Sequence, residues 1–106
     1  MYNIEELIGE IVTIKFTSGI EVVAQLLSHD EDHNILHLSE PRIVVINGDD
    51  LALIPYLFTG PATAVTIPVN TVMSVVKSHQ RSAEDYEKIV AVVDEYQQET
   101  KQEVIE

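Results

Sequence analysis

The sequence has no cysteine among its 106 residues. A disulfide framework, a thiolate-bound metal and a cysteine nucleophile are therefore excluded. Glycine is scarce too, at four residues, and the chain has no Gly-rich loop for phosphate groups, no nucleophile elbow and no suitably spaced pair of acids. These absences predict a protein that is not an enzyme and that uses no cofactor.

Long apolar runs are also missing from the sequence. No stretch approaches the ~18 apolar residues of a membrane span. The opening segment, Met1 to Glu6, lacks the basic patch and the apolar run of a signal peptide. The sequence therefore predicts a cytoplasmic protein that makes no contact with a membrane.

Basic residues are few, with six Lys and Arg against 18 Asp and Glu and a net charge of −12. Residues 1–81 hold ten acids and four bases, and residues 82–106 hold eight and two, so each part carries the same net charge of −6. Phosphate repels such a chain, because neutralisation of phosphate by Lys and Arg dominates most nucleic-acid affinity. The charge therefore disfavours nucleic acid as a partner.

The apolar pattern predicts a mainly β domain. Hydrophobic residues make up 45% of the chain and charged residues 23%, the balance of an ordinary globule with one core. Asn3, Glu6 and Gly9 predict a short N-terminal helix with a capping box. Five strands follow, at residues 10–16, 20–29, 35–46, 51–58 and 64–76, the last interrupted at Pro68. Five short strands predict a small barrel or sandwich.

A different pattern follows residue 81. Ser82 begins a helix over residues 82–98 with apolar residues at helical spacing, namely Tyr86, Ile89, Val90, Val93 and Tyr96. Its polar face is acidic, whereas helices that lie on membranes are usually basic. We expect this amphipathic helix to pack on the barrel or on a neighbouring subunit, with a frayed tail from about Thr100. Residues 1–81 and 82–106 form one domain.

Two sequence motifs resemble those of the Sm-like family, which includes bacterial Hfq. The first runs from Ile11 through Gly19 to a polar loop in which Asn34 follows Asp30 by four residues. The second is Asn70-Thr71-Val72, which resembles the Hfq version, although Pro68-Val69 replaces the Arg-Gly pair of typical Sm proteins. The resemblance covers residues 3–77, and the chain is similar in particular to Sm-like proteins of cyanophages.

The resemblance implies a strongly bent five-stranded barrel. Members of the family close into rings of about five to eight subunits by pairing the fourth strand of one subunit with the fifth of the next. Open edge strands need such a partner, and residues 51–58 and 64–76 are apolar enough to be these edges. We therefore expect a homo-oligomeric ring, in the cytoplasm of a bacterial host if a phage encodes the protein.

The resemblance also implies a place for single-stranded RNA. The family's stacking residue, base-binding Asn and clamping Arg fall here on Asp32, Asn34 and Pro68, so the motif keeps Asn34 alone. Asp32 offers no flat face and Pro68 no donor, which weakens the pocket since stacking contributes ~1–3 kcal/mol per base. His33 could stack a base, but strand alternation would point it into the subunit.

Other chemistry is less favoured by the pattern. His29, His33 and His37 recur every four residues with Asp30 and Asp32 between them, which are ligand types for a divalent metal. A turn separates them, so we interpret them as solvated loop residues. Ser28, His29 and Asp30 are adjacent on a strand and point to opposite faces, so they form no catalytic relay.

Two hypotheses follow. The first is an interaction or scaffold ring whose C-terminal helix binds protein partners. The second is an RNA-binding ring that uses Asn34 and four basic residues, Lys15, Arg42, Lys77 and Arg81. If these four basic residues lie on one face of the protein, they favour the RNA-binding ring. If they are dispersed over the surface, they favour the scaffold ring.

Overall fold

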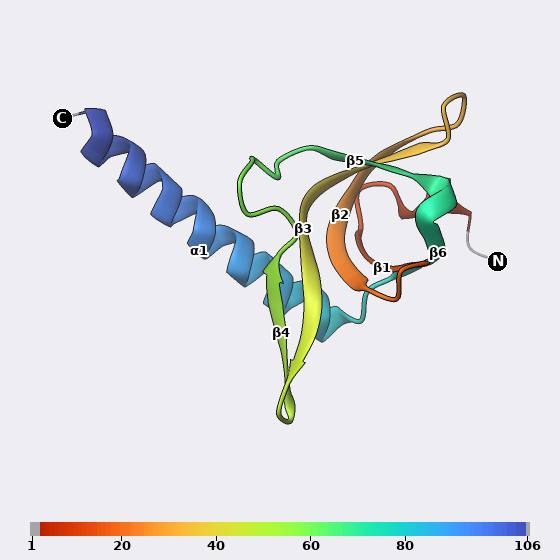
Figure 1. The fold of residues 1–106 in the computed structure, drawn as a ribbon, viewed down its shortest axis with the longest axis horizontal. Helices are drawn as coiled ribbons and strands as arrows, with labels where there is room; N and C mark the ends of the chain where they lie inside the picture. Colours follow the sequence, from red (N-terminus) through yellow and green to blue (C-terminus); the bar gives the residue numbers. More distant parts are fainter. Residues whose placement is uncertain (1–2, 106) are drawn as a thin grey trace.

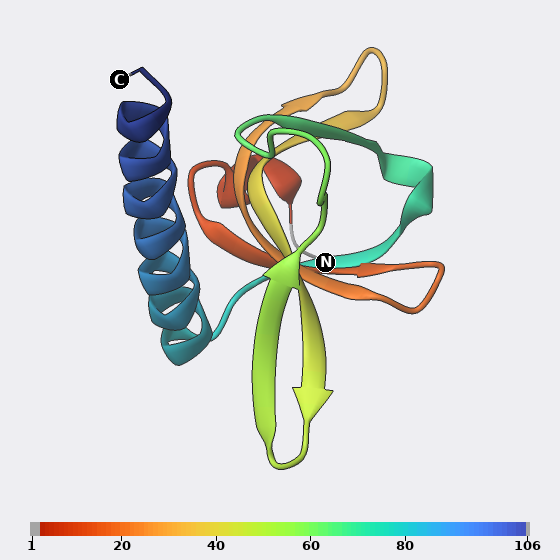
Figure 2. The ribbon, with the colours of Figure 1, turned by 60° about the vertical axis from the view of Figure 1, so that its left-hand side comes forward.

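A curled antiparallel sheet carries one long helix on its outer face (Figure 1, Figure 2). The computed structural model describes residues 3–105, with side chains to Val92. Strand β1 (Ile11–Phe16) shows how the sequence builds the sheet, because its burial alternates from residue to residue. Val12, Ile14 and Phe16 face the core and the residues between them face outward, as the period of two predicts.

Strands β1, β2 (Glu21–Asp30) and β3 (Ile35–Asn47) form a continuous antiparallel meander. The register of β2 against β3 shifts twice, between Val23 and Gln25 and between Leu26 and Ser28. Such bulges increase the local twist and bend a strand. The thirteen residues of β3 can therefore curve around the core.

The two halves of β3 have different partners on the edge away from β2. Strand β4 (Asp50–Pro55) pairs with Arg42 to Asn47, and β5 (Val65–Pro68) pairs with Ile35 to Leu38. Three residues of 3₁₀ helix, η2 (Val69–Thr71), then lead into β6 (Val72–Lys77), which pairs with β1. The sheet curls and brings β5 close to β6. A link of only three residues can therefore join its two sides.

The predicted five-stranded barrel is wrong in two respects. The structure has six strands, since Pro68 lacks an amide hydrogen and the chain turns at η2, which separates β5 from β6. The sheet is also not a closed barrel, because its order is β4-β3-β2-β1-β6 and, within residues 3–105, β4 and β6 do not pair with each other. The fourth predicted strand ends at Pro55 instead of Phe58.

The predicted N-terminal helix is a single 3₁₀ turn, η1 (Ile4–Leu7). Asn3 caps this turn, and its side chain accepts a hydrogen bond from the backbone nitrogen of Glu5. A capping box requires the backbone nitrogen of Glu6 as the donor, so the predicted capping box does not form. A positive φ of 88° at Gly9 then directs the chain into β1. Leu7 anchors the turn in the core.

Helix α1 (Gln80–Ile105) begins two residues before the predicted start and continues beyond residue 98. Residues 98–105 contain neither Gly nor Pro, so nothing in that sequence stops the helix. Tyr86 is buried and its hydroxyl donates to the Ser39 carbonyl at 2.7 Å, which fixes the helix on the sheet. The predicted stripe positions Val93 and Tyr96 lie outside the residues whose side chains are described.

The C-terminal half of α1 projects beyond the sheet (Figure 1). In residues 3–105, no helix combines the length and the apolar character needed to cross a bilayer.

Adjacent leucines on β2 test the alternation directly. Leu26 is fully buried and Leu27 is 40% exposed. Replacing Leu26 by Ala should lower the free energy of unfolding by about 2–5 kcal/mol, because the lost side chain leaves a cavity. The matched Leu27→Ala variant should lose about 1 kcal/mol or less. Chemical denaturation measures both, and equal losses would contradict the assignment of the two faces.

Candidate functional site

The turn between β2 and β3, residues 31–34, is held by Asp30. Its carboxylate accepts from the His33 backbone nitrogen at 3.2 Å and lies 2.8 Å from His33 Nδ1. Asn34 closes the turn with a φ of 56°, a left-handed conformation that asparagine tolerates better than most residues. The Asp and Asn of the first motif therefore both shape this turn.

The fold places this turn beside the second motif. The backbone nitrogen of Val69 donates to the Asn34 carbonyl at 2.9 Å, and Ile35 stands opposite Pro68 in the β3–β5 pairing. Asn34 and Pro68, which are distant in sequence, are thus neighbours. Asp32, His33, Asn34 and Pro68 are all exposed. In the described part of the chain, the Asn34 side chain makes no hydrogen bond, so its amide can reach a partner.

His33 does not point into the subunit as strand alternation predicted. Its side chain is 74% exposed because residue 33 belongs to a turn, where the alternation of a strand does not apply. The imidazole is instead held against Asp30. A flat side chain therefore lies at the surface beside Asn34, together with the carboxylates of Asp30 and Asp32.

The four basic residues do not gather at this turn. Arg42 is buried on β3, 3.9 Å from a Glu40 carboxylate oxygen, and Lys77 on β6 lies 3.6 Å from Glu10. Lys15 stands opposite Glu21 in the β1–β2 register, and Arg81 lies in the first turn of α1. An acidic neighbour offsets three of the four charges. The chain offers no cationic face beside Asn34 from these residues.

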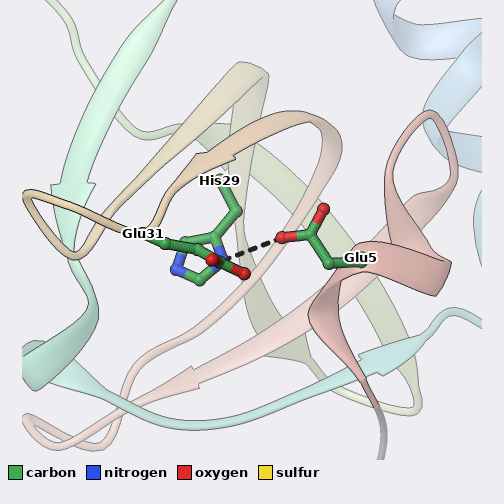
Figure 3. A group of neighbouring side chains, drawn as sticks. All are labelled: Glu5, His29 and Glu31. Carbon is green, nitrogen blue, oxygen red and sulfur yellow. Dashed lines mark hydrogen bonds and ion pairs between the residues drawn. The ribbon is translucent and has the colours of Figure 1, made fainter.

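A cluster that the sequence did not reveal joins η1 to the end of β2 (Figure 3). Glu5, His29 and Glu31 each present one ligand atom within 4.8 Å of the others. His29 Nδ1 lies 3.3 Å from a Glu5 carboxylate oxygen, and the His29 side chain is only 12% exposed. A hydrogen bond to Glu5 therefore accounts for the position of His29 without an ion. No sequence signal could have found this pair, since 24 positions separate Glu5 from His29.

The three histidines that recur every four residues do not come together. His29 turns toward Glu5, His33 bonds Asp30, and His37 stands opposite Ser28 in the β2–β3 pairing. Ser28, His29 and Asp30 likewise form no relay, because His29 and Asp30 bond different partners. The interpretation of all three as solvated loop residues holds for His33 alone, because His29 belongs to β2 with a side chain only 12% exposed and His37 belongs to β3.

Apolar side chains lie exposed at both ends of the sheet. On the β3–β4 hairpin, Ile46 is 79% exposed and its cross-strand partner Leu51 is 66% exposed. On β6, Met73 is 66% exposed and Val76 is 39% exposed. Strands β4 and β6 end the path β4-β3-β2-β1-β6 in the described residues, and β5, which pairs there with β3 alone, has a free side as well. The β4 and β6 edges combine unpaired backbone groups with exposed apolar surface.

Helix α1 and the outer face of the sheet enclose a groove of about 930 Å³. Its floor crosses the sheet from Leu53 on β4 through Val44, Val23 and Thr13 to Val76 on β6, and Ser82, Asp85 and Ile89 of α1 line its wall. The floor residues alternate with core residues, so the groove lies on the face opposite the core. The groove therefore extends across the sheet from β4 to β6.

The fold is similar to that of a heptameric archaeal Sm protein of known crystal structure. The two share a TM-score of 0.50 and 16% sequence identity over 71% of this chain and 94% of the archaeal one. A chain of the NatC complex bound to CoA aligns with a TM-score of 0.48 and 14% identity over 81% and 96% of the two chains. No family model matches the sequence, and no curated protein sequence matches it. The likeness to the archaeal protein shows an Sm-like fold.

The Asp30 carboxyl provides a test of the turn. Hydrogen bonds from the His33 side chain and backbone stabilise the carboxylate and lower the pKa of Asp30. In a titration followed by NMR, we expect His33→Ala to raise this pKa, while His37→Ala should leave it unchanged. Because the pKa is lowered on folding, the stabilisation is present above the unfolded pKa and is lost as the pH falls through the folded pKa. An unchanged pKa in His33→Ala would contradict the bond.

Proposed function

We propose that the protein is a non-enzymatic, homo-oligomeric ring that acts as an interaction or scaffold module. The observation that carries this proposal is the pair of free, apolar sheet edges at β4 and β6. Exposed edges of this kind promote uncontrolled aggregation unless another strand covers them. A ring that pairs each β4 with the β6 of the next copy covers both of these edges.

The likeness to known structures agrees with a ring, since the similar archaeal Sm protein is heptameric. The acidic composition and the dispersed bases favour protein over nucleic acid as the ligand of such a ring. Helix α1, whose C-terminal half projects beyond the sheet, supplies a surface for a partner (Figure 1). A phage origin and a location in the host cytoplasm remain predictions of the sequence resemblance.

The mass in solution tests the ring. Multi-angle light scattering and native mass spectrometry should give a single species of about five to eight times the 11.9 kDa chain mass. The species should persist at moderate salt, because backbone pairing and apolar contact are screened little by ions. A protein that stays monomeric at micromolar concentration would refute the proposal.

RNA binding is the second candidate function, and the proximity of Asn34 to Pro68 favours it. Sm-like proteins that bind RNA use the positions equivalent to these, and the exposed imidazole of His33 lies beside the Asn34 amide. A base could stack on His33 and bond to Asn34. The neighbouring carboxylates of Asp30 and Asp32 oppose a phosphate backbone, so binding of this kind would be weak and would lack the steep loss of affinity with salt that Lys and Arg contacts cause.

Titration with short poly-U and poly-A at low and moderate salt tests this candidate. If RNA binds, Asn34→Gly should weaken binding about tenfold or more, through loss of a hydrogen-bonded base contact. Glycine is the proper replacement since it accepts the φ of 56° at this position. Asn47→Gly, on the distant β3–β4 hairpin, is the control. Absence of binding at low salt, or equal affinity of both variants, would exclude the Asn34 pocket.

A further inference from the structure

We propose that β4 of a second copy of this chain pairs with β6, so that Leu51 of its β3–β4 hairpin extends the floor of the groove beneath α1. The inference rests on the proposed ring and deepens it. It assigns to α1, which lies outside the Sm-like part of the sequence, the role of a clamp over the joint between subunits. The incoming strand lies in the plane of the sheet beside β6, and its Leu51 side chain reaches the β6 end of the groove, below the first turns of the helix.

The lengths and faces of the two edge strands define the register of this joint. Strands β4 and β6 each have six residues. Full antiparallel overlap places Leu51 of one copy opposite Val76 of the next. Both side chains line the groove face of their own sheet. A shift of one residue would put a groove-facing side chain of one strand opposite a core-facing one of the other, because side chains alternate along a strand.

Charge supports the same register. The hairpin tip carries Asp49 and Asp50, and the overlap places Asp50 directly opposite Lys77. His79 and Arg81 follow Lys77 at the start of α1, where few other bases exist in this acidic chain. The acidic tip therefore meets Lys77 and His79, which line the same groove as two carboxylates, Glu21 and Asp85. Opposite charges facing each other across two strands stabilise their pairing.

Apolar burial provides the attraction. Leu51 and its cross-strand neighbour Ile46 form an exposed apolar pair on the hairpin, and Val76 is partly exposed on β6. In the joint, Leu51 of one copy packs on Val76 of the next, with Ser82 of that copy's helix lining the same space. The exposed Leu51 side chain then becomes part of an interface at the β6 end of the groove.

Cysteine cross-linking tests the register, and the chain has no cysteine to interfere. Directly opposed residues of antiparallel strands have Cα atoms about 4.5–5.5 Å apart, within the range of about 4.4–6.8 Å for a disulfide. The variant with both Leu51→Cys and Val76→Cys should form a ladder of covalent multimers on oxidation. The control with Leu51→Cys and Ser74→Cys keeps the same face but separates the pair to about 7–8 Å, so it should link poorly.

Affinity tests the groove itself. Leu51→Asp places a carboxylate in the groove and should raise the subunit dissociation constant about 10- to 100-fold, the equivalent of losing one buried leucine. Leu57→Asp, a comparable change in the loop after β4, should leave it near the wild-type value. Leu51 is 66% exposed within one subunit, so its replacement leaves the subunit folded.

The outcomes separate the two proposals. A monomeric wild-type protein refutes the ring, and the clamp with it. The wild-type protein could be multimeric while the variant with Leu51→Cys and Val76→Cys forms no more cross-links than the control with Leu51→Cys and Ser74→Cys. That result would leave the ring proposal standing and overturn the clamp. The clamp is likewise overturned if Leu51→Asp and Leu57→Asp have equal dissociation constants. Selective linking together with selective weakening by Leu51→Asp supports it.

Discussion

Three residues, Val69 to Thr71, link a strand on one side of the sheet to a strand on the other. Strand β5 belongs beside β3, and β6 belongs beside β1, so the sheet between them has to curl back on itself. The bulges on β2 permit that curl, and the apolar side chains of β1, β2 and β3 fill its inside. The same constraint leaves β4 and β6 as edges that do not pair with each other within residues 3–105.

Those two edges connect the fold to its proposed function. An edge strand presents backbone donors and acceptors that water satisfies in the monomer and that another strand satisfies in an assembly. Here the β4 and β6 edges also carry exposed apolar side chains. Burial of these side chains between neighbouring copies of a ring would be a physical reason for their exposure in one chain. The high negative charge is compatible with such an assembly, because like charges would keep separate rings apart in solution.

Most of the strands could be predicted because burial on one face imposes a period of two. The alternation of Val12, Ile14 and Phe16 identified β1, and the polar residues 29–34, which interrupt the apolar pattern, identified the turn that follows β2. The sequence did not reveal that β4 and β5 share one edge of β3, since strand pairing depends on contacts that are remote in the chain. The Sm-like resemblance, by contrast, predicted an architecture that the structural comparison supports.

Features built from distant segments were beyond prediction for the same reason. The bond between His29 and Glu5 joins η1 to β2, and the groove needs five strands and a helix to form its floor and wall. The exposed position of His33 was missed because a turn residue was treated as part of a strand. Residues 30–34 therefore show both the success and the failure of prediction. Their motif was recognised from the sequence, but the directions of their side chains became clear only in the structure.

Hydrogen exchange at the sheet edges tests the central claim most directly. Alternate amides of β4 and β6 point away from β3 and β1 and have no strand partner within one described chain. If copies join edge to edge, these outward amides should exchange as slowly as those inside β1, and dilution to monomers should abolish their protection. If they exchange as fast as the amides of the exposed turn at residues 31–34 while the protein is multimeric, the edges are not where the copies meet.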